Sequence, residues 1–346
     1  MIRIIFSITI ISTLLLSEDI QSQTEDNYLD STHKTISDSV HTFSDRTDNL
    51  FMKAIDYLSE KDEKNKKSKE PLTSKQLGKA DKLFQNDKYL DETRKSFIKL
   101  SNEYNANSIG ENSFKLKLKA KLRLHKTKEN INLFINGMDQ DNMDEITNTN
   151  PKENEKTEIG ISVLQDINKR LESKYSIGIR SFDLFVRARY TYKKTAGRWD
   201  IEPVQTFEYS FEDEFEEKTK LYFDTKIMKK VFFRTEIGRG TQSKNIGMDY
   251  NTAFSLFWTP QKKTGISLIQ NFSGNTEYKY ISNDTIGEKT KFTGINNYST
   301  QITFRQSVFR EWIFYELNPG VNFHKDNDFD PNYSFSARLE FFFGGI

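Results

Sequence analysis

The feature that most constrains the fold is a strict alternation of apolar and cationic residues over positions 115–124. Every second residue is apolar, and the residues between them are all cations: Lys115, Lys117, Lys119, Lys121 and Arg123. A period of two is that of a β-strand, because successive strand side chains point to opposite faces. A helix would instead spread these cations around its surface. We therefore expect a strand with one apolar face and one aqueous face.

The same period recurs along the chain as far as its last segment, Tyr333 to Phe343, where aromatic and aliphatic residues alternate with Ser, Arg and Glu. The connections between these segments alternate in length. Short turns are expected at 126–128, 194–197, 228–229, 259–262 and 309–310, and longer polar loops at 137–156, 212–216, 241–245, 276–293 and 324–331. Short turns on one side and long loops on the other are typical of a transmembrane β-barrel.

The strand count follows from the same pattern. Thirteen strands can be counted from residue 113 onward, and a single-chain bacterial barrel needs an even number. The segment Ser96 to Tyr104 supplies one more strand, with Ile98 and Leu100 on one face. Residues 96–346 are therefore predicted to form an all-β transmembrane antiparallel barrel of about 14 strands, with 12 as the alternative.

Composition separates this architecture from other classes. The chain contains 28 Phe, 15 Tyr and 3 Trp together with 29 % charged residues, which is too aromatic for a disordered protein. The mixture suits strands with one face in lipid and the other in water, whereas a soluble β-sandwich or lipocalin-like barrel would turn its apolar face inward. The absence of cysteine excludes disulfides and an N-terminal lipoprotein anchor, and the net charge of +1 gives no nucleic-acid signal.

The N-terminal region differs from the rest. Arg3, the apolar run from Ile4 to Leu16 and the small residue Ser22 predict a signal peptide over 1–23, because the run is short for a membrane anchor, which needs about 20 residues. Residues 24–95 are expected to be a helical periplasmic or plug segment. One amphipathic helix is predicted over about 32–60 and a second over about 73–95, with a charged linker at 59–70.

Several short motifs add a resemblance. They are Phe185 to Arg189 (FVRAR), Gly197 to Trp199 (GRW), Glu311 to Pro319 (EWIFYELNP) and Arg338 to Gly344 (RLEFFFG). These segments resemble an uncharacterised family of proteobacterial signal-peptide-bearing outer-membrane β-barrel proteins. The resemblance is clearest over about 180–345 and weaker over 87–135. It implies the barrel and the bacterial outer membrane as its location, and it implies no activity.

Charged residues opposite the apolar face are expected to point into the lumen. They are Lys115, Lys117, Lys119, Lys121, Arg123, Arg187, Arg189, Glu202, Arg234, Glu236, Arg305, Glu316, Arg338 and Glu340. Mixed charge inside a barrel can form paired networks that brace the lumen, or set a transverse field across a pore. The five cations of the 115–123 segment have no acidic counterpart on the next strand. They are expected to attract anions or to dock the acidic N-terminal helices.

Residues suited to catalysis or metal binding are few. The four histidines (His33, His41, His125 and His324) are expected at the surface, and none forms a metal-ligand pair with another. His324 with Asp326 and Asp328 is the only arrangement that resembles a protease rim. The acidic groups of the first and last long loops are interpreted as solvated charge, with bridging by divalent cations to lipopolysaccharide as an alternative. We therefore predict no enzyme, no metal site and no cofactor.

Three functions remain, in decreasing order of support. The first is a porin-like passive channel for small, in particular anionic, solutes, because about 14 strands leave lumen space that side chains alone need not fill. The second is a non-conducting structural or adhesion barrel that is plugged or tethered by its N-terminal helices. The third is an outer-membrane hydrolase. The expected partners are outer-membrane lipid and lipopolysaccharide, the barrel assembly machinery and a periplasmic partner of residues 24–95, but no nucleic acid.

Overall fold

The computed structural model describes residues 30–40, 42, 80, 83–84, 90, 93, 95–124, 130–136, 157–281 and 289–344. The predicted signal peptide and the charged linker lie outside these residues, as do His41 and His125. Within the described part of the chain, no helix is both long enough and apolar enough to cross a membrane.

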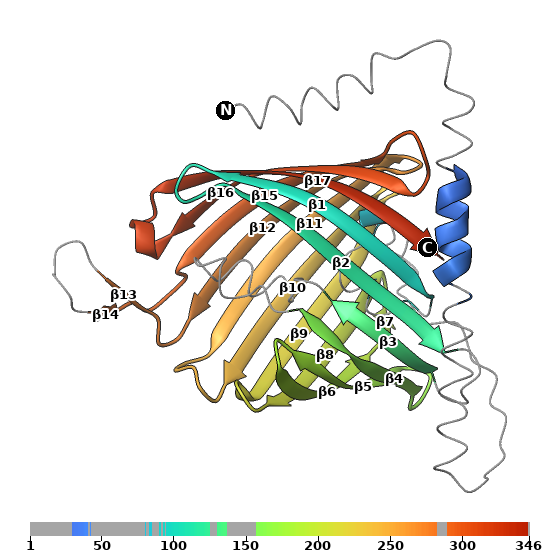
Figure 1. The fold of residues 1–346 in the computed structure, drawn as a ribbon. Coiled ribbons are helices and arrows are strands. Elements are labelled where there is room, and N and C mark those ends of the chain that lie inside the picture. Colours follow the sequence, from blue (N-terminus) through green and yellow to red (C-terminus); the bar gives the residue numbers. More distant parts are fainter. Residues whose placement is uncertain are drawn as a thin grey trace, which may run out of the picture.

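The described chain is dominated by one antiparallel sheet that closes on itself (Figure 1). Its strands are β1 (Phe97–Asn107), β2 (Ser113–Leu124), β3 (Asn130–Asn136), β4 (Glu158–Asp166), β5 (Leu171–Arg180), β6 (Asp183–Tyr192), β8 (Trp199–Ser210), β9 (Glu214–Met228), β10 (Val231–Gln242), β11 (Asp249–Gln261), β12 (Thr264–Asn275), β15 (Asn297–Ser307), β16 (Ile313–His324) and β17 (Pro331–Gly344). Each strand pairs with its neighbour in this order, and β1 pairs with β17. The predicted 14-strand antiparallel barrel is confirmed, including its first strand.

Four small elements are not among the fourteen strands of the barrel. β7 (Lys194–Ala196) folds back on the start of β8, and β13 (Lys279–Ile281) pairs with β14 (Lys289–Lys291) in a separate hairpin. A single 3-10 turn, η1 (Lys325–Asn327), follows β16. In Figure 1 the β13–β14 hairpin extends from one end of the barrel, and the C-terminus lies at the opposite end.

The two ends of the barrel differ in their connections. At the short-turn end, where β17 ends and β1 begins, β9 joins β10 and β11 joins β12 through two residues each. At the long-loop end, residues 276–296 connect β12 to β15 and contain the β13–β14 hairpin. One connection at the long-loop end is unexpectedly tight. Ser181 and Phe182 join β5 to β6, and both have positive φ (46° and 74°), as in a type I′ hairpin.

Side-chain polarity is inverted relative to a soluble protein. Apolar side chains such as those of Leu116 (61 % exposed) and Ile177 (50 %) cover the outside of the barrel, whereas Arg305 (1 %) and Glu340 (0 %) are buried. Exposing so large an apolar surface to water would be unfavourable, whereas lipid can cover it. A closed sheet has no edge, so the backbone groups of its strands are paired within the sheet even where lipid surrounds it. The chain therefore has the fold of an outer-membrane β-barrel, with its apolar band toward lipid.

A short N-terminal helix over residues 30–40 lies against the barrel at the short-turn end, beside the C-terminus (Figure 1). The His33 ring stacks on Trp312, with centroids 4.2 Å apart, and its Nε2 lies 2.8 Å from the carbonyl oxygen of Phe342. Ser37 Oγ accepts a hydrogen bond from the Gly344 amide at 3.2 Å, and Arg310 Nε lies 2.7 Å from Asp30 Oδ1. His33 is thus half-buried against the barrel, which corrects its expected surface position.

Candidate functional site: the charged inner face

The predicted lumen-facing residues lie on the face of the sheet opposite the exposed apolar residues. Eight of them are buried, namely Lys117, Lys119, Lys121, Glu202, Arg234, Arg305, Glu316 and Glu340. Six are half-buried, namely Lys115, Arg123, Arg187, Arg189, Glu236 and Arg338. Their burial requires partners, because an uncompensated charge away from water is strongly destabilising.

The largest group of partners spans the seam at which the barrel closes. We call it the seam network; it comprises Lys99, Glu103, Lys117, Arg305, Glu316, Arg338 and Glu340. Glu340 of β17 lies 2.9 Å from Lys99 of β1 and 2.5 Å from Arg305 of β15. Arg338 of β17 contacts Glu103 of β1 at 3.0 Å and Glu316 of β16 at 3.3 Å. The network therefore fastens the first strand to the last and to two strands beyond it.

One member of the network, Lys117, is among the 115–123 cations. Lys117 Nζ lies 3.2 Å from Glu103 Oε2, so it has an acidic counterpart on the preceding strand, β1, rather than on the next one. Aromatic rings support the same network, since the Arg305 guanidinium lies 4.6 Å from the Phe314 ring centroid. The seam cations are thus held by carboxylates and by ring faces.

A smaller paired group lies on the β9–β10 wall. Arg234 makes a bidentate contact with Asp224, at 2.7 Å through Nε and 2.9 Å through Nη2, and its guanidinium lies 5.3 Å from the Tyr222 ring. Lys220 lies 3.6 Å from Glu236. These contacts brace neighbouring strands, and like those of the seam network they balance charge locally.

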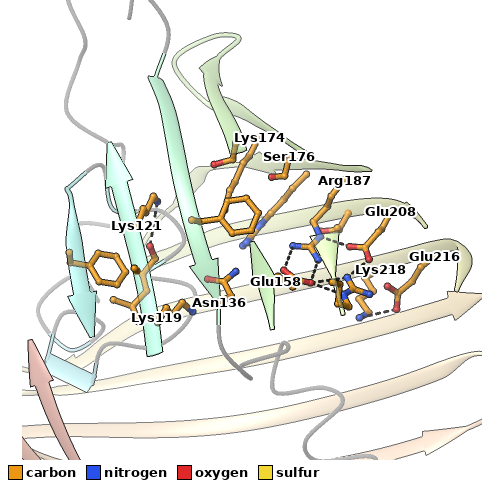
Figure 2. Close-up of a pocket in the computed structure, with 18 residues that line it drawn as sticks. Lys119, Lys121, Asn136, Glu158, Lys174, Ser176, Arg187, Glu208, Glu216 and Lys218 are labelled. Atoms are coloured by element: carbon orange, nitrogen blue, oxygen red, sulfur yellow. Dashed lines mark hydrogen bonds and ion pairs between the residues drawn. The ribbon is translucent and has the colours of Figure 1, made fainter. Parts of the chain in front are cut away.

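A third group, which we call the arginine clamp, lies near the long-loop end of β4, β5, β6 and β8. It consists of Arg180, Arg187, Glu158 and Glu208. Both arginines contact Glu158 at 2.8 Å, and both also contact Glu208 (Figure 2). Each guanidinium also lies over the Phe185 ring, at 5.1 Å for Arg180 and 4.8 Å for Arg187. Two guanidinium groups are therefore fixed in direction by carboxylates and by one ring.

Glycine allows that ring to lie flat on the sheet. A Cβ on Gly178 would meet the Phe185 ring at 2.8 Å and the carbonyl oxygen of Ile159 at 2.6 Å. Gly160 accommodates the Phe134 ring in the same way, at 2.7 Å. A larger residue at either position would push the aromatic side chain away from the wall. The two glycines therefore let these rings lie close to the backbone beneath the clamp.

A polar cavity of about 100 Å³ lies in front of this wall (Figure 2). Seven cationic side chains and three carboxylates line it among the described residues. The cations are Lys119, Lys121, Lys174, Arg180, Arg187, Arg189 and Lys218, and the carboxylates are Glu158, Glu208 and Glu216. Two of the five predicted 115–123 cations therefore reach this cavity, and they meet there cations of β5, β6 and β9.

An apolar contact on the inner face lies at the opposite, short-turn end. Ala80 (0 % exposed) and Phe84 pack on Phe232 of β10 and Phe257 of β11, with the Phe84 and Phe257 centroids 5.3 Å apart. A Cβ on Gly265 of β12 would meet the Phe84 ring at 2.6 Å. We call Phe232, Phe257 and Gly265 the inner socket, because the segment before β1 fills it.

A polar contact holds the same segment. Lys121 Nζ donates to the carbonyl oxygen of Thr93 at 2.6 Å, and the Arg123 amide donates to Ser96 Oγ at 2.9 Å. The described residues of 80–96 are therefore attached to the inner wall both by apolar packing and by hydrogen bonds from β2.

Sequence reasoning missed several charges that complete these groups: Lys99, Glu103, Glu158, Lys174, Arg180 and Lys218. The signal was clear for Lys99, which lies between Ile98 and Leu100, and for Glu158, which alternates with Ile159 and Ile161. It was absent for Lys218, which lies between Glu217 and Thr219. Alternation assigns a residue to a face, but the register between strands decides which charges meet.

His324 was expected at the surface, and this prediction was wrong. Its side chain is 2 % exposed, and its Nδ1 accepts a hydrogen bond from the Asp326 amide at 3.1 Å, which begins η1. Burial raises the pKa of the Tyr278 hydroxyl, and so does the hydrogen bond that it donates to Asp326. His324 and Asp326 thus order a loop, and the described residues contain no group of three or more His, Cys, Asp or Glu side chains placed to hold a metal.

Comparisons with known proteins give only solved structures of low similarity. No protein-family model matches the sequence, and no curated protein matches it. Among solved structures, the CymD monoaromatic hydrocarbon channel is 8 % identical, covering 76 % of this chain and 92 % of that one, with a TM-score of 0.44. OpdK of Pseudomonas aeruginosa, solved with vanillate, is 8 % identical over 72 % and 98 %, with a TM-score of 0.42. The KdgM porin is 6 % identical over 70 % and 98 %, with a TM-score of 0.35.

Proposed function

We propose that the protein is a porin-like passive channel for small solutes. The observation that carries the proposal is the closed 14-strand barrel whose inner face is charged and encloses a polar cavity. Barrels of about eight strands are filled by their own side chains, whereas larger ones leave room for an aqueous path. The seam network and the arginine clamp hold the charged side chains against the wall, which keeps them out of that path.

Liposome swelling tests this function directly. Vesicles that contain the full-length protein are transferred into isotonic solutions of polyols and organic acids of increasing size. A passive channel gives swelling rates that fall steadily with solute size and do not saturate with concentration. Swelling no faster than that of protein-free vesicles, for every solute, would contradict the proposal.

A second function, a barrel plugged by its N-terminal segment, is favoured by the inner socket. Large apolar residues are costly on a water-filled inner wall, yet Phe232 and Phe257 lie there and are covered by Ala80 and Phe84. The helix over 30–40 is attached at the same end, through His33 and Trp312. Both attachments hold the N-terminal segment at the short-turn mouth.

The chain contains no cysteine, so a crosslink can separate the two functions. In the variant with Phe84→Cys and Phe257→Cys, a short bifunctional thiol reagent links the two cysteines and fixes the segment in the socket. In Phe84→Asp, the carboxylate would be unfavourable inside the apolar socket, so the segment leaves it. A plug predicts swelling that is absent in the bridged protein and restored in Phe84→Asp. An open channel predicts equal swelling from both. The same pair of cysteines left unbridged is the matched control.

We propose that the chain belongs to the proteobacterial family that its C-terminal motifs resemble, and that it has no enzymatic activity. Outer-membrane lipid and lipopolysaccharide would contact the exposed apolar band, the barrel assembly machinery would insert the chain, and residues 24–95 would face a periplasmic partner.

A further inference from the structure

The connections at the short-turn end of the barrel, which the C-terminus marks in Figure 1, are strongly cationic. Five of them lie wholly within the described residues: 167–170, 193–198, 229–230, 262–263 and 308–312. Together they contain ten Lys or Arg residues and one carboxylate, that of Glu311. Seven of the ten cationic side chains are exposed, and we call these seven the basic rim: Lys169, Arg170, Lys194, Arg198, Lys229, Lys230 and Lys262.

The opposite end of the barrel has the reverse charge. Its five fully described connections contain six carboxylates and two lysines; they are residues 108–112, 181–182, 211–213, 243–248 and 325–330. Solubility alone does not explain such a separation, because residues of either sign keep a turn hydrated. The separation therefore indicates that the surroundings of the short-turn end favour cations.

All three tryptophans of the chain lie at this same end. Trp199 begins β8, Trp258 lies near the end of β11, and Trp312 directly precedes β16. Trp258 is 45 % exposed on the outer face, and Trp199 lines an apolar groove with Ile201 and Phe223. Tryptophan is enriched where the hydrocarbon of a membrane meets its headgroups. The three rings therefore indicate that the headgroup layer surrounds the short-turn end.

Cations of the basic rim lie beside these rings. The Arg198 guanidinium lies 5.7 Å from the Trp199 ring centroid. The amide of Thr259, which follows Trp258, donates to the carbonyl oxygen of Lys230 at 2.9 Å, and Lys230 Nζ donates to the carbonyl oxygen of Pro260. Long cationic side chains at this depth extend toward the headgroups. A lipid whose acyl chains contact a ring would thus have its phosphate near a cation.

We propose that the basic rim binds the phosphate groups of anionic phospholipids in the leaflet at the short-turn end. In an outer-membrane barrel, this end faces the periplasm. Cations near a membrane surface attract anionic headgroups, and the attraction grows with the number of cations. The proposal does not rest on the proposed channel, since a plugged barrel presents the same rim.

An acidic protein segment is the alternative occupant, because Arg310 already contacts Asp30 of the N-terminal helix at 2.7 Å. The distribution of the exposed cations favours lipid. They come from four separate connections, between β4 and β12, and they flank tryptophans of the outer face. A headgroup layer surrounds the whole barrel and meets all of these positions, whereas a single segment would meet only some of them.

Quenching of tryptophan fluorescence by brominated lipid tests the proposal, because all three tryptophans lie at this end. The full-length protein is inserted into vesicles of equal amounts of phosphatidylcholine and phosphatidylglycerol, in which one lipid or the other carries bromine on its acyl chains. Both leaflets have the same composition, so the direction of insertion does not matter. At low ionic strength we expect brominated phosphatidylglycerol to quench at least about twofold more strongly. The two lipids should quench equally at 1 M salt, where the screening length is about 3 Å.

Lys229→Gln with Lys262→Gln removes two exposed cations near Trp258. This variant should lose at least about a third of the excess quenching, since Trp258 is one of the three reporting rings. Lys244→Gln with Lys279→Gln is the matched control, because it removes two exposed lysines at the long-loop end. Equal quenching by the two lipids in the unmodified protein, or an equal loss in both variants, would overturn the proposal.

Binding of poly-glutamate to the protein in non-ionic detergent examines the alternative occupant. Equal quenching by the two lipids, together with poly-glutamate binding that is lost in Lys229→Gln with Lys262→Gln, would assign the rim to an acidic protein and overturn the lipid assignment. Failure of the channel function is distinguishable, because the lipid preference would then persist while vesicle swelling stayed at the protein-free rate.

Discussion

Replacing Glu340 by Gln should destabilise the barrel more than any comparable change to an exposed carboxylate. The Glu340 side chain is fully buried, and its carboxylate lies 2.9 Å from Lys99, 2.5 Å from Arg305 and 3.9 Å from Arg338. The neutral amide removes the negative charge and leaves buried cations less compensated. Removing one partner of a buried ion pair costs about 3–5 kcal/mol. Because Glu340 and Lys99 are on β17 and β1, the loss falls on the closing seam.

The assay is urea unfolding of the protein in detergent micelles, followed by tryptophan fluorescence and by the difference in gel mobility between unheated and boiled samples. The midpoint should fall while the slope stays the same, since the variant changes stability and not the surface exposed on unfolding. Glu311→Gln is the matched control. Its carboxylate contacts Lys263 but its side chain is 80 % exposed, so its loss should leave the urea midpoint nearly unchanged. A Glu340→Gln penalty as small as that of Glu311→Gln would refute the seam network as a source of stability.

Three further changes test other parts of the inner face and rim. Gly178→Ala should cost about 1–3 kcal/mol in urea unfolding, because its Cβ would overlap the Phe185 ring; Gly240→Ala, where the nearest atom is 3.5 Å away, should be nearly neutral. Arg234→Met alone should destabilise by about 3–5 kcal/mol, whereas adding Asp224→Leu should restore most of that loss, and an additive double variant would contradict the pairing. His33→Ala should remove a stacking contact of about 0.5–1.5 kcal/mol and speed proteolysis of the helix over 30–40, whereas the exposed Lys34→Ala should not.

Much of the fold could be predicted because a period of two is a local signal. The alternation of Leu116 and Leu118 with Lys117 and Lys119 reports both the strand and its two faces without any knowledge of the neighbours. The even-number rule then identified Ser96 to Tyr104 as a strand, and β1 begins at Phe97.

The partners of the inner charges could not be predicted in the same way. Whether Glu103 meets Arg338 depends on the register between β1 and β17, which joins residues more than two hundred positions apart. A shift of one residue would turn every side chain to the other face, so the register is well determined by the fold but invisible in a single strand.

The inner socket left a fainter trace in the sequence. Phe232 and Phe257 are aromatic residues at positions where their strands otherwise present polar side chains inward, as Arg234 and Ser255 do. Such exceptions could have indicated a covering segment. Its identity could not have been read from periodicity, because Ala80 and Phe84 belong to a different kind of element.

Planar-bilayer recording of the full-length protein tests the channel most directly. We expect discrete, steady conductance steps. Conductance that appears only in Phe84→Asp would mean that the resting barrel is plugged. Silence from both the full-length protein and Phe84→Asp would contradict the channel.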